Sequence, residues 1–148
     1  MKTLINNGHI FTEAQDCHGD ILIEDEKIVS IGSNLLEKAD EGAGVRIIDA
    51  QGCYVLPGAV DVHTHMDLDT GTARAVDDFY DGTVAAVCGG TTTIVDHMAF
   101  GPAGVPLHYQ LDVYKKLAEG KAVIDYGFHG TAQHVDDEIL DELETMAA

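Results

Sequence analysis

The sequence predicts an α/β protein in which a small β-rich segment precedes three strand–helix units of a parallel sheet. Residues 1–54 contain short alternating apolar runs separated by turn residues, which is typical of β-strands. From residue 55 onward, strands alternate with amphipathic helices, and this alternation indicates parallel strands. The sheet is therefore either small and open, or the front part of a larger assembly such as a (β/α)₈ barrel, which needs eight units.

The β-rich segment is expected to contain three pieces. Residues 3–11 predict a strand, a turn at Asn7-Gly8 and a return strand, because Asn-Gly favours tight hairpins. Residues 19–32 predict a second hairpin around an acidic turn, and residues 44–58 continue the pattern. Residues 33–44 predict an exposed connection. Together these pieces indicate the N-terminal part of a small β domain over residues 1–54.

Three strands and three helices are expected in residues 55–148. The first strand is short and buried and ends in Asp61-Val-His-Thr-His65, and the others cover residues 91–98 and 121–130. The helices follow at 77–90, 106–120 and 135–148, and helical spacing predicts their buried faces. Those faces consist of Phe79, Thr83, Ala86 and Val87; of Leu107, Leu111, Tyr114 and Leu117; and of Val135, Ile139, Leu143 and Met146. Cys88 is expected to be a core residue.

Charge and cysteine content narrow the function classes. Lys and Arg number 8 against 26 Asp and Glu, a formal net charge of −18. Such a chain repels nucleic-acid backbones and anionic membrane surfaces, so neither is an expected partner. Cys17, Cys53 and Cys88 form no C-x-x-C pair, which favours free thiols in a reducing compartment. No signal-peptide or membrane-spanning pattern is present, so a cytoplasmic location is expected.

Two histidines at the end of the first parallel strand are the strongest functional signal. Side chains two residues apart in a strand point to the same face, so His63 and His65 should converge. The carboxyl ends of parallel strands are where active sites lie in α/β proteins. Two neutral imidazoles at such a place are natural metal ligands, and a zinc site needs one or two more. A structural histidine pair is the alternative interpretation.

Other residues at the same edge are candidates for supporting the pair. His97 and His129 end the second and third strands, and each is a candidate for a ligand, a hydrogen-bond partner of a ligand or a packed polar residue. Asp61 shares the face of His63 and His65 and is a candidate for orienting an imidazole. Asp96 is expected to point away from the face of His97, so no joint role is assigned to it.

The segments that carry these features resemble the cyclic amidohydrolases. The stretch from Gly52 to Gly104, with its "PGAVDVHTHMDLDTGTA" and "TTTIVDHMAFGPAG" motifs, is similar to the dihydropyrimidinase, D-hydantoinase and phenylhydantoinase group. The resemblance extends to the opening strands and to "KAVIDYGFHG", and so covers essentially the whole chain. It implies the first part of a (β/α)₈ barrel over residues 55–148, preceded by part of a small β-sandwich.

The resemblance also implies a chemistry. Relatives hold two metal ions, usually Zn²⁺, and hydrolyse a ring amide, with the H-x-H histidines as ligands of one metal; these match His63 and His65. The loop from Met66 to Ala73, with Met66 and Leu68, corresponds to one that shapes the substrate pocket. The bridging carboxylated lysine, two more histidines and an aspartate belong to later parts of the family.

The chain ends before those later residues, so the resemblance predicts a truncated chain that is inactive alone. The full-length parent is expected to be a homo-oligomer, as tetramers are common in the family. An allantoinase or dihydroorotase activity is the alternative substrate class. A non-catalytic assembly protein of the same fold is a second alternative, which the presence of both His63 and His65 disfavours.

Overall fold

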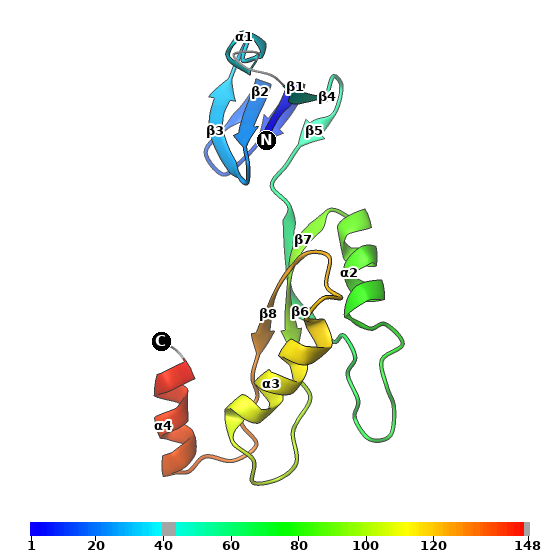
Figure 1. Ribbon diagram of the computed structural model, residues 1–148, viewed down its shortest axis with the longest axis vertical. Coiled ribbons are helices and arrows are strands. Elements are labelled where there is room, and N and C mark those ends of the chain that lie inside the picture. The colour runs from blue at the N-terminus through cyan, green and yellow to red at the C-terminus, as the bar shows by residue number, and fades with distance from the viewer. Residues whose placement is uncertain (40–43, 147–148) are drawn as a thin grey trace. The chain divides into compact units, whose positions relative to one another are not determined.

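The computed structural model describes residues 1–39 and 44–146, and the chain divides into two compact units (Figure 1). The first unit is Met1–Pro57 and the second is Gly58–Ala148. Each unit has its own sheet and its own buried apolar cluster. In the described ranges no helix combines the length and the apolar character needed to cross a membrane.

The first unit is one mixed sheet. Its strand order is β3-β2-β1-β4, and β5 also pairs with β1. β1 runs antiparallel to β2 and parallel to β4 and β5, while β2 and β3 form an antiparallel hairpin, as the sequence predicted. The strands are β1 (Lys2–Phe11), β2 (Asp16–Glu24), β3 (Lys27–Gly32), β4 (Val45–Asp49) and β5 (Tyr54–Val55).

The hairpin predicted at Asn7-Gly8 is wrong. β1 continues through these residues, and its register against β2 shifts between Ile5 and Gly8, which marks a β-bulge. Asn7 takes a left-handed φ of 60°, and its N–H donates to Oδ1 of Asp20 at 3.0 Å. Asn tolerates this conformation in a bulge as well as in a turn, so the dipeptide alone does not distinguish the two.

Most of residues 33–39 are exposed, as the sequence predicted, but two apolar residues among them are buried. The segment includes the short helix α1 (Leu36–Ala39), and Leu35 and Ala39 are buried against Leu4 and Leu22 of the sheet. Burial of these two apolar side chains explains why the connection packs down on the sheet. The rest of the predicted connection, residues 40–43, lies outside the described residues.

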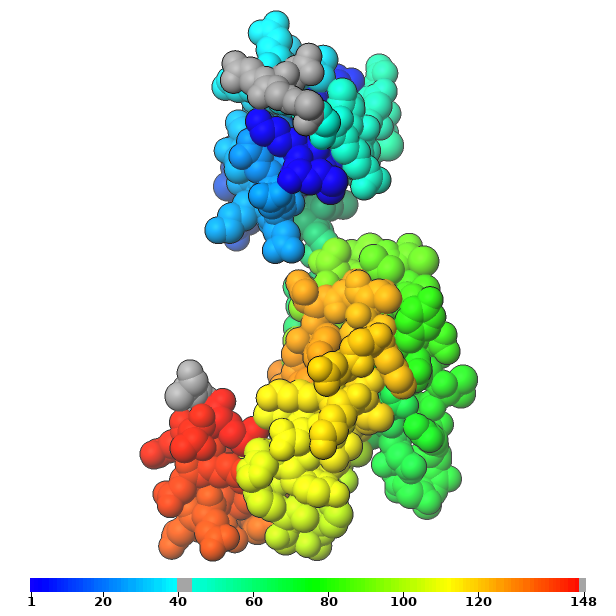
Figure 2. All heavy atoms as spheres, viewed as in Figure 1, coloured from blue at the N-terminus to red at the C-terminus, as the bar shows by residue number. Residues whose placement is uncertain are grey.

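The second unit is a parallel sheet with helices between its strands, which confirms the predicted α/β alternation. The order is β6-β7-β8, and both pairings are parallel. α4 lies beside α3 (Figure 2), where Glu142 accepts hydrogen bonds from the backbone N–H groups of Leu107 at 2.6 Å and His108 at 3.1 Å. The elements are β6 (Ala59–Thr64), α2 (Phe79–Cys88), β7 (Thr91–His97), α3 (Leu107–Ala118), β8 (Asp125–His129) and α4 (Asp137–Met146).

The core of the second unit lies between the sheet and helices α2 and α3. Helical spacing correctly predicts Phe79, Thr83 and Tyr114 among its buried residues, and Ile94 of β7 completes the centre. The Tyr114 hydroxyl accepts the Ala99 N–H at 2.9 Å, so even the polar end of this ring is satisfied. Ile139 is also buried, as predicted for α4.

Several apolar residues expected in the interior are exposed. Val87 is 43% exposed and Cys88 is also exposed, because no described element covers the last turn of α2. Val135 precedes α4 rather than belonging to it. β6 was expected to be buried, yet Val60 is 57% exposed, because in the described part of the chain β6 pairs on one side only. Exposed fractions of at least 40% also apply to Val62, Val135, Leu143 and Met146.

Thr83 supplies a stability prediction. Its hydroxyl donates to the Phe79 carbonyl and accepts the Val123 N–H at 3.1 Å, which ties α2 to the segment before β8. Thr83→Val removes the acceptor of this part-buried N–H, so we expect the free energy of unfolding to fall by about 0.5–1.5 kcal/mol. Urea unfolding followed by circular dichroism measures this. The exposed Thr145→Val is the control, and an equal loss in both variants would contradict the assignment.

Candidate metal-ligand edge

The carboxyl ends of the three parallel strands form one edge of the second unit. His63 lies near the end of β6 and His65 directly after it, while His97 and His129 end β7 and β8. The register pairs His97 with His129 across the two strands. The sequence placed all four imidazoles at a common edge, and the structure brings them together.

His63 and His65 converge as their spacing predicts. Their Nε2 atoms are 3.2 Å apart, and both side chains are exposed. Two nitrogen ligands of one tetrahedral zinc ion, each at about 2.0–2.1 Å from the metal, lie about 3.3 Å from each other. The observed separation therefore fits two ligands of a single metal ion.

His97 and His129 extend the pair into a row of rings. The ring of His97 stacks on that of His63, with centroids 3.8 Å apart and planes inclined by 16°. His129 follows, with a centroid distance of 4.5 Å to His97. Burial lowers the pKa of His97, and the neighbouring rings of His63, His129 and His65 lower it further. The lowered pKa favours the neutral form of the His97 imidazole, the form in which histidine binds metals.

A complete metal centre is not assembled by the residues described. Within residues 1–39 and 44–146, no group of three or more His, Cys, Asp or Glu side chains is arranged to hold a metal ion. The edge presents a convergent pair in His63 and His65, with His97 packed against it. The remaining coordination positions of a metal ion bound by that pair would have to be filled by ligands other than the described residues.

Asp61 contacts the backbone of the pair rather than a ring. Its Oδ1 accepts the N–H of His63 at 3.1 Å. This hydrogen bond holds the chain just before the first imidazole. The candidate role of orienting an imidazole directly has no hydrogen bond to support it in the described structure, so Asp61 acts on His63 through the main chain.

Asp96 is the site residue that sequence reasoning missed. It is fully buried at the end of β7, and its Oδ2 accepts hydrogen bonds from the Thr64 hydroxyl and the Met66 N–H, each at 2.7 Å. Burial raises the pKa of Asp96, and these two hydrogen bonds oppose that effect. The sequence did contain a signal for this residue. Strand alternation places Asp96 on the same face as Ile94, toward the core, and an ionisable residue at a core position is unusual.

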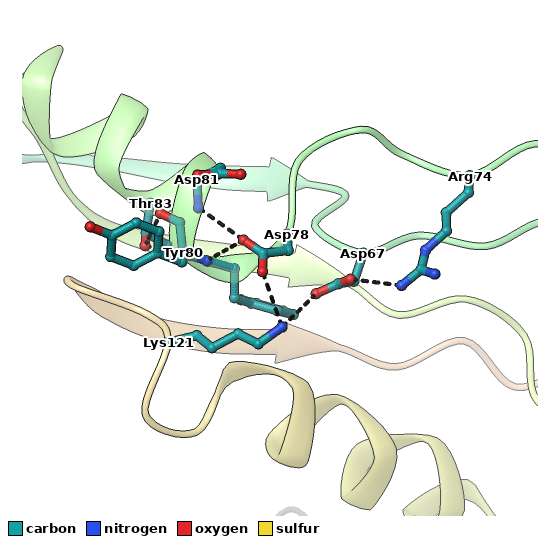
Figure 3. Close-up of polar contacts among 8 residues, drawn as sticks. Asp67, Arg74, Asp78, Tyr80, Asp81, Thr83 and Lys121 are labelled. Atoms are coloured by element: carbon teal, nitrogen blue, oxygen red, sulfur yellow. Dashed lines mark hydrogen bonds and ion pairs between the residues drawn. The ribbon is translucent and has the colours of Figure 1, made fainter.

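The loop after the histidines is anchored by charges (Figure 3). Asp67 is 8% exposed and has a left-handed φ of 52°. Arg74 donates to it at 3.1 Å, and the ammonium of Lys121 lies 4.0 Å from its other oxygen. Lys121 also donates at 3.1 Å to Asp78, the N-cap of α2. Figure 3 shows Lys121 between the two carboxylates, so the loop and the helix start share one cation.

Apolar contacts anchor the same loop from the other side. Met66 packs on the core of the second unit and fills the space beside Gly82, where an added Cβ would lie 2.1 Å from its sulfur. Leu68 is half-buried, and its carbonyl accepts the Ala75 N–H at 2.8 Å. Of the two loop residues named from the sequence, Met66 thus serves as an internal anchor.

A separate cavity of about 280 Å³ lies between the loops after β7 and β8 and helices α3 and α4. Its lining is mostly apolar and includes Met98, Val105, Ile139 and Leu143. None of the four histidines of the edge lines it, although Met98 and Gly130 directly follow two of them. The cavity is therefore a neighbour of the edge rather than part of it.

The fold and the edge define a class: α/β proteins whose functional groups lie at the carboxyl ends of parallel strands. Within it, the chain is similar to the D-phenylhydantoinase of Escherichia coli O9:H4 (strain HS), with 50% identity over 147 residues. A D-hydantoinase crystal structure matches with a TM-score of 0.90 and 44% identity, covering 99% of this chain and 31% of that one. The dihydropyrimidinase of Brevibacillus agri NCHU1002 matches with a TM-score of 0.90 and 42% identity over the same shares.

These comparisons confirm the resemblance to the hydantoinase and dihydropyrimidinase group. The match to the Escherichia coli relative covers 99% of this chain, yet the chain spans only 31% of that relative's length. No protein-family model matches the chain. The relatives carry the names of enzymes that act on cyclic amides, and the match takes in nearly the whole of this chain.

The shared cation gives a pH prediction. The Asp81 N–H and Lys121 hold the pKa of Asp78 below its ordinary value. Asp78 therefore contributes stability above about pH 3.9, the ordinary carboxyl pKa, and loses it as pH falls through the lowered value. Asp78→Asn keeps an N-cap but loses the charge, so we expect a lower Tm at pH 6.

Thermal unfolding between pH 2.5 and pH 7 measures the difference, which should shrink toward zero at the acidic end. Asp81→Asn, a change in the same helical turn, is the matched control. A difference between Asp78→Asn and the unchanged protein that stayed constant over the whole range would contradict the ionic origin of the effect.

Proposed function

We propose that the protein to which this chain contributes hydrolyses the C–N bond of a cyclic amide, opening the ring of a hydantoin or a dihydropyrimidine. The observation that carries the proposal is the convergence of the His63 and His65 Nε2 atoms at 3.2 Å, at the carboxyl edge of a parallel sheet. The names of the relatives point to the same substrates. Allantoin-like and dihydroorotate-like rings belong in the same substrate panel as the alternatives.

The donor set suits zinc. His63 and His65 would hold one ion, and the bridging carboxylated lysine, further histidines and the aspartate of a two-metal site are expected from parts of the protein outside this chain. Bound zinc supplies polarisation of an amide carbonyl and a lowered pKa for a water molecule. The three-strand sheet is then the start of a (β/α)₈ barrel, and the first unit is part of a small β-sandwich domain.

The chain's own residues have supporting roles in this proposal. His97 stacks on His63 and limits rotation of the His63 ring, and the ring of His129 lies next to that of His97. Asp61 holds the main chain of His63. The loop that begins at Met66 shapes one side of the substrate pocket, with Met66 as its anchor and the half-buried Leu68 two residues further on.

The proposal also covers the oligomeric state, the location and the length of the active protein. A homo-oligomer, tetrameric as is common in the family, and a cytoplasmic location are parts of it, and the three free cysteines agree with a reducing compartment. Since the histidine pair is only half of a ligand set, the 148-residue chain alone should show no ring opening. The mass of the protein in its source cells, by immunoblot and mass spectrometry, decides which species to assay.

Substitution of the pair tests the proposal. His63→Ala and His65→Ala in the whole protein should each abolish ring opening of hydantoin and dihydrouracil. Each should also lower the zinc content, because each removes a residue that binds the metal directly. Zinc content by atomic absorption and ring opening by ultraviolet absorbance are the measurements. The exposed His18→Ala, in the first unit, is the control.

Retained zinc and retained ring opening in both variants would refute the assignment. An unchanged protein that binds no zinc and opens no ring of the panel would favour the non-catalytic assembly protein instead. Activity confined to allantoin or dihydroorotate would move the substrate class and leave the roles of His63 and His65 intact.

A further inference from the structure

We propose that Asp96 is a positioning residue that holds the Thr64 hydroxyl and the Met66 N–H, on the two sides of His65, and so sets the separation of the two imidazoles. The inference rests on the proposed metal-binding role of His63 and His65. Asp96 lies on the neighbouring strand β7, and its hydrogen bonds go to Thr64 and Met66, the two residues that flank His65.

The geometry concentrates both hydrogen bonds on one atom. Oδ2 of Asp96 accepts the Thr64 hydroxyl and the Met66 N–H, each at 2.7 Å. Oδ1 is buried and has no hydrogen-bond partner among the described residues. A single oxygen therefore fixes the position of a tripeptide whose central residue carries a candidate ligand.

The main chain needs this support because the strand pairing is irregular at this point. The register of β6 against β7 shifts between Asp61 and Thr64, so His63 lies in an irregular stretch of the strand pair. Such irregularities re-aim side chains and weaken the ladder locally. The Asp96 hydrogen bonds restore a fixed connection between β6 and β7 immediately after it.

The energetic cost of Asp96 favours a functional role over a purely structural one. A fully buried carboxylate that leaves one oxygen unpaired is expensive, and an apolar residue at this position would avoid that cost. Strand alternation places Thr64 on the opposite face of β6 from the imidazoles, so Asp96 acts on the pair through the Thr64 side chain and the Met66 main chain.

The test compares four variants of the whole protein, one of which is a control. Asp96→Ala removes both hydrogen bonds and should weaken zinc affinity by about 10- to 100-fold, the usual effect of losing a residue that orients a metal ligand. Asp96→Asn offers one carbonyl oxygen that can accept both bonds, so its affinity should stay closer to that of the unchanged protein. Thr64→Val removes one bond and should fall between, with Thr64→Ser as its matched control.

Zinc affinity is measured by competition with a chromophoric chelator, and the visible spectrum of bound Co²⁺ reports ligand geometry. Thermal unfolding shows which variants are folded. If Asp96→Ala does not fold, the comparison of Asp96→Asn with Thr64→Val carries the test. We expect an altered Co²⁺ spectrum in Thr64→Val and an unaltered one in Asp96→Asn.

Two results would overturn the inference. A folded Asp96→Ala with unchanged zinc affinity would show that the pair needs no such support. An Asp96→Asn as weak as Asp96→Ala would show that the charge matters rather than the geometry. Loss of zinc binding in the His63 and His65 variants, with none in the Asp96 series, refutes this inference and leaves the proposed function standing. Unchanged zinc binding in the histidine variants refutes the proposed function itself.

Discussion

Strand β7 pairs in parallel with β6 on one side and with β8 on the other, and the candidate site depends on this central position. Parallel pairing puts the three carboxyl ends at one edge, and the register then decides which residues meet across it. His97 contacts the rings of both neighbouring strands because it ends the strand between them. The core of the second unit, centred on Phe79 and Ile94, packs β7 against the helices and so fixes the position of this edge.

Electrostatics adds a second constraint in a chain with few cations. Only 8 of the 148 residues are Lys or Arg, yet two of them, Arg74 and Lys121, lie within 4.0 Å of the Asp67 carboxylate. Asp67 is buried, so a cation close to it offsets part of the cost of removing its charge from water. The loop that follows the histidines thereby gains a defined path without a regular element of its own.

Strand periodicity explains how much of the site could be predicted from the sequence. Alternation every two residues was enough to place His63 and His65 on one face, and the parallel order was enough to bring His97 and His129 to the same edge. Asp96 could not be given a role in this way, because its contact with Thr64 depends on the register between two strands, which no local pattern specifies. The bulge at Asn7 was missed for the same reason: its partner, Asp20, lies on another strand.

The contact between Gly82 and Met66 links two positions that are 16 residues apart in the sequence and belong to different elements. Any side chain at position 82 would compete for the volume that the methionine sulfur occupies, so the size of one residue limits the size of the other. A larger residue at position 82 fits without displacing the loop after the histidines only when a smaller residue stands at position 66.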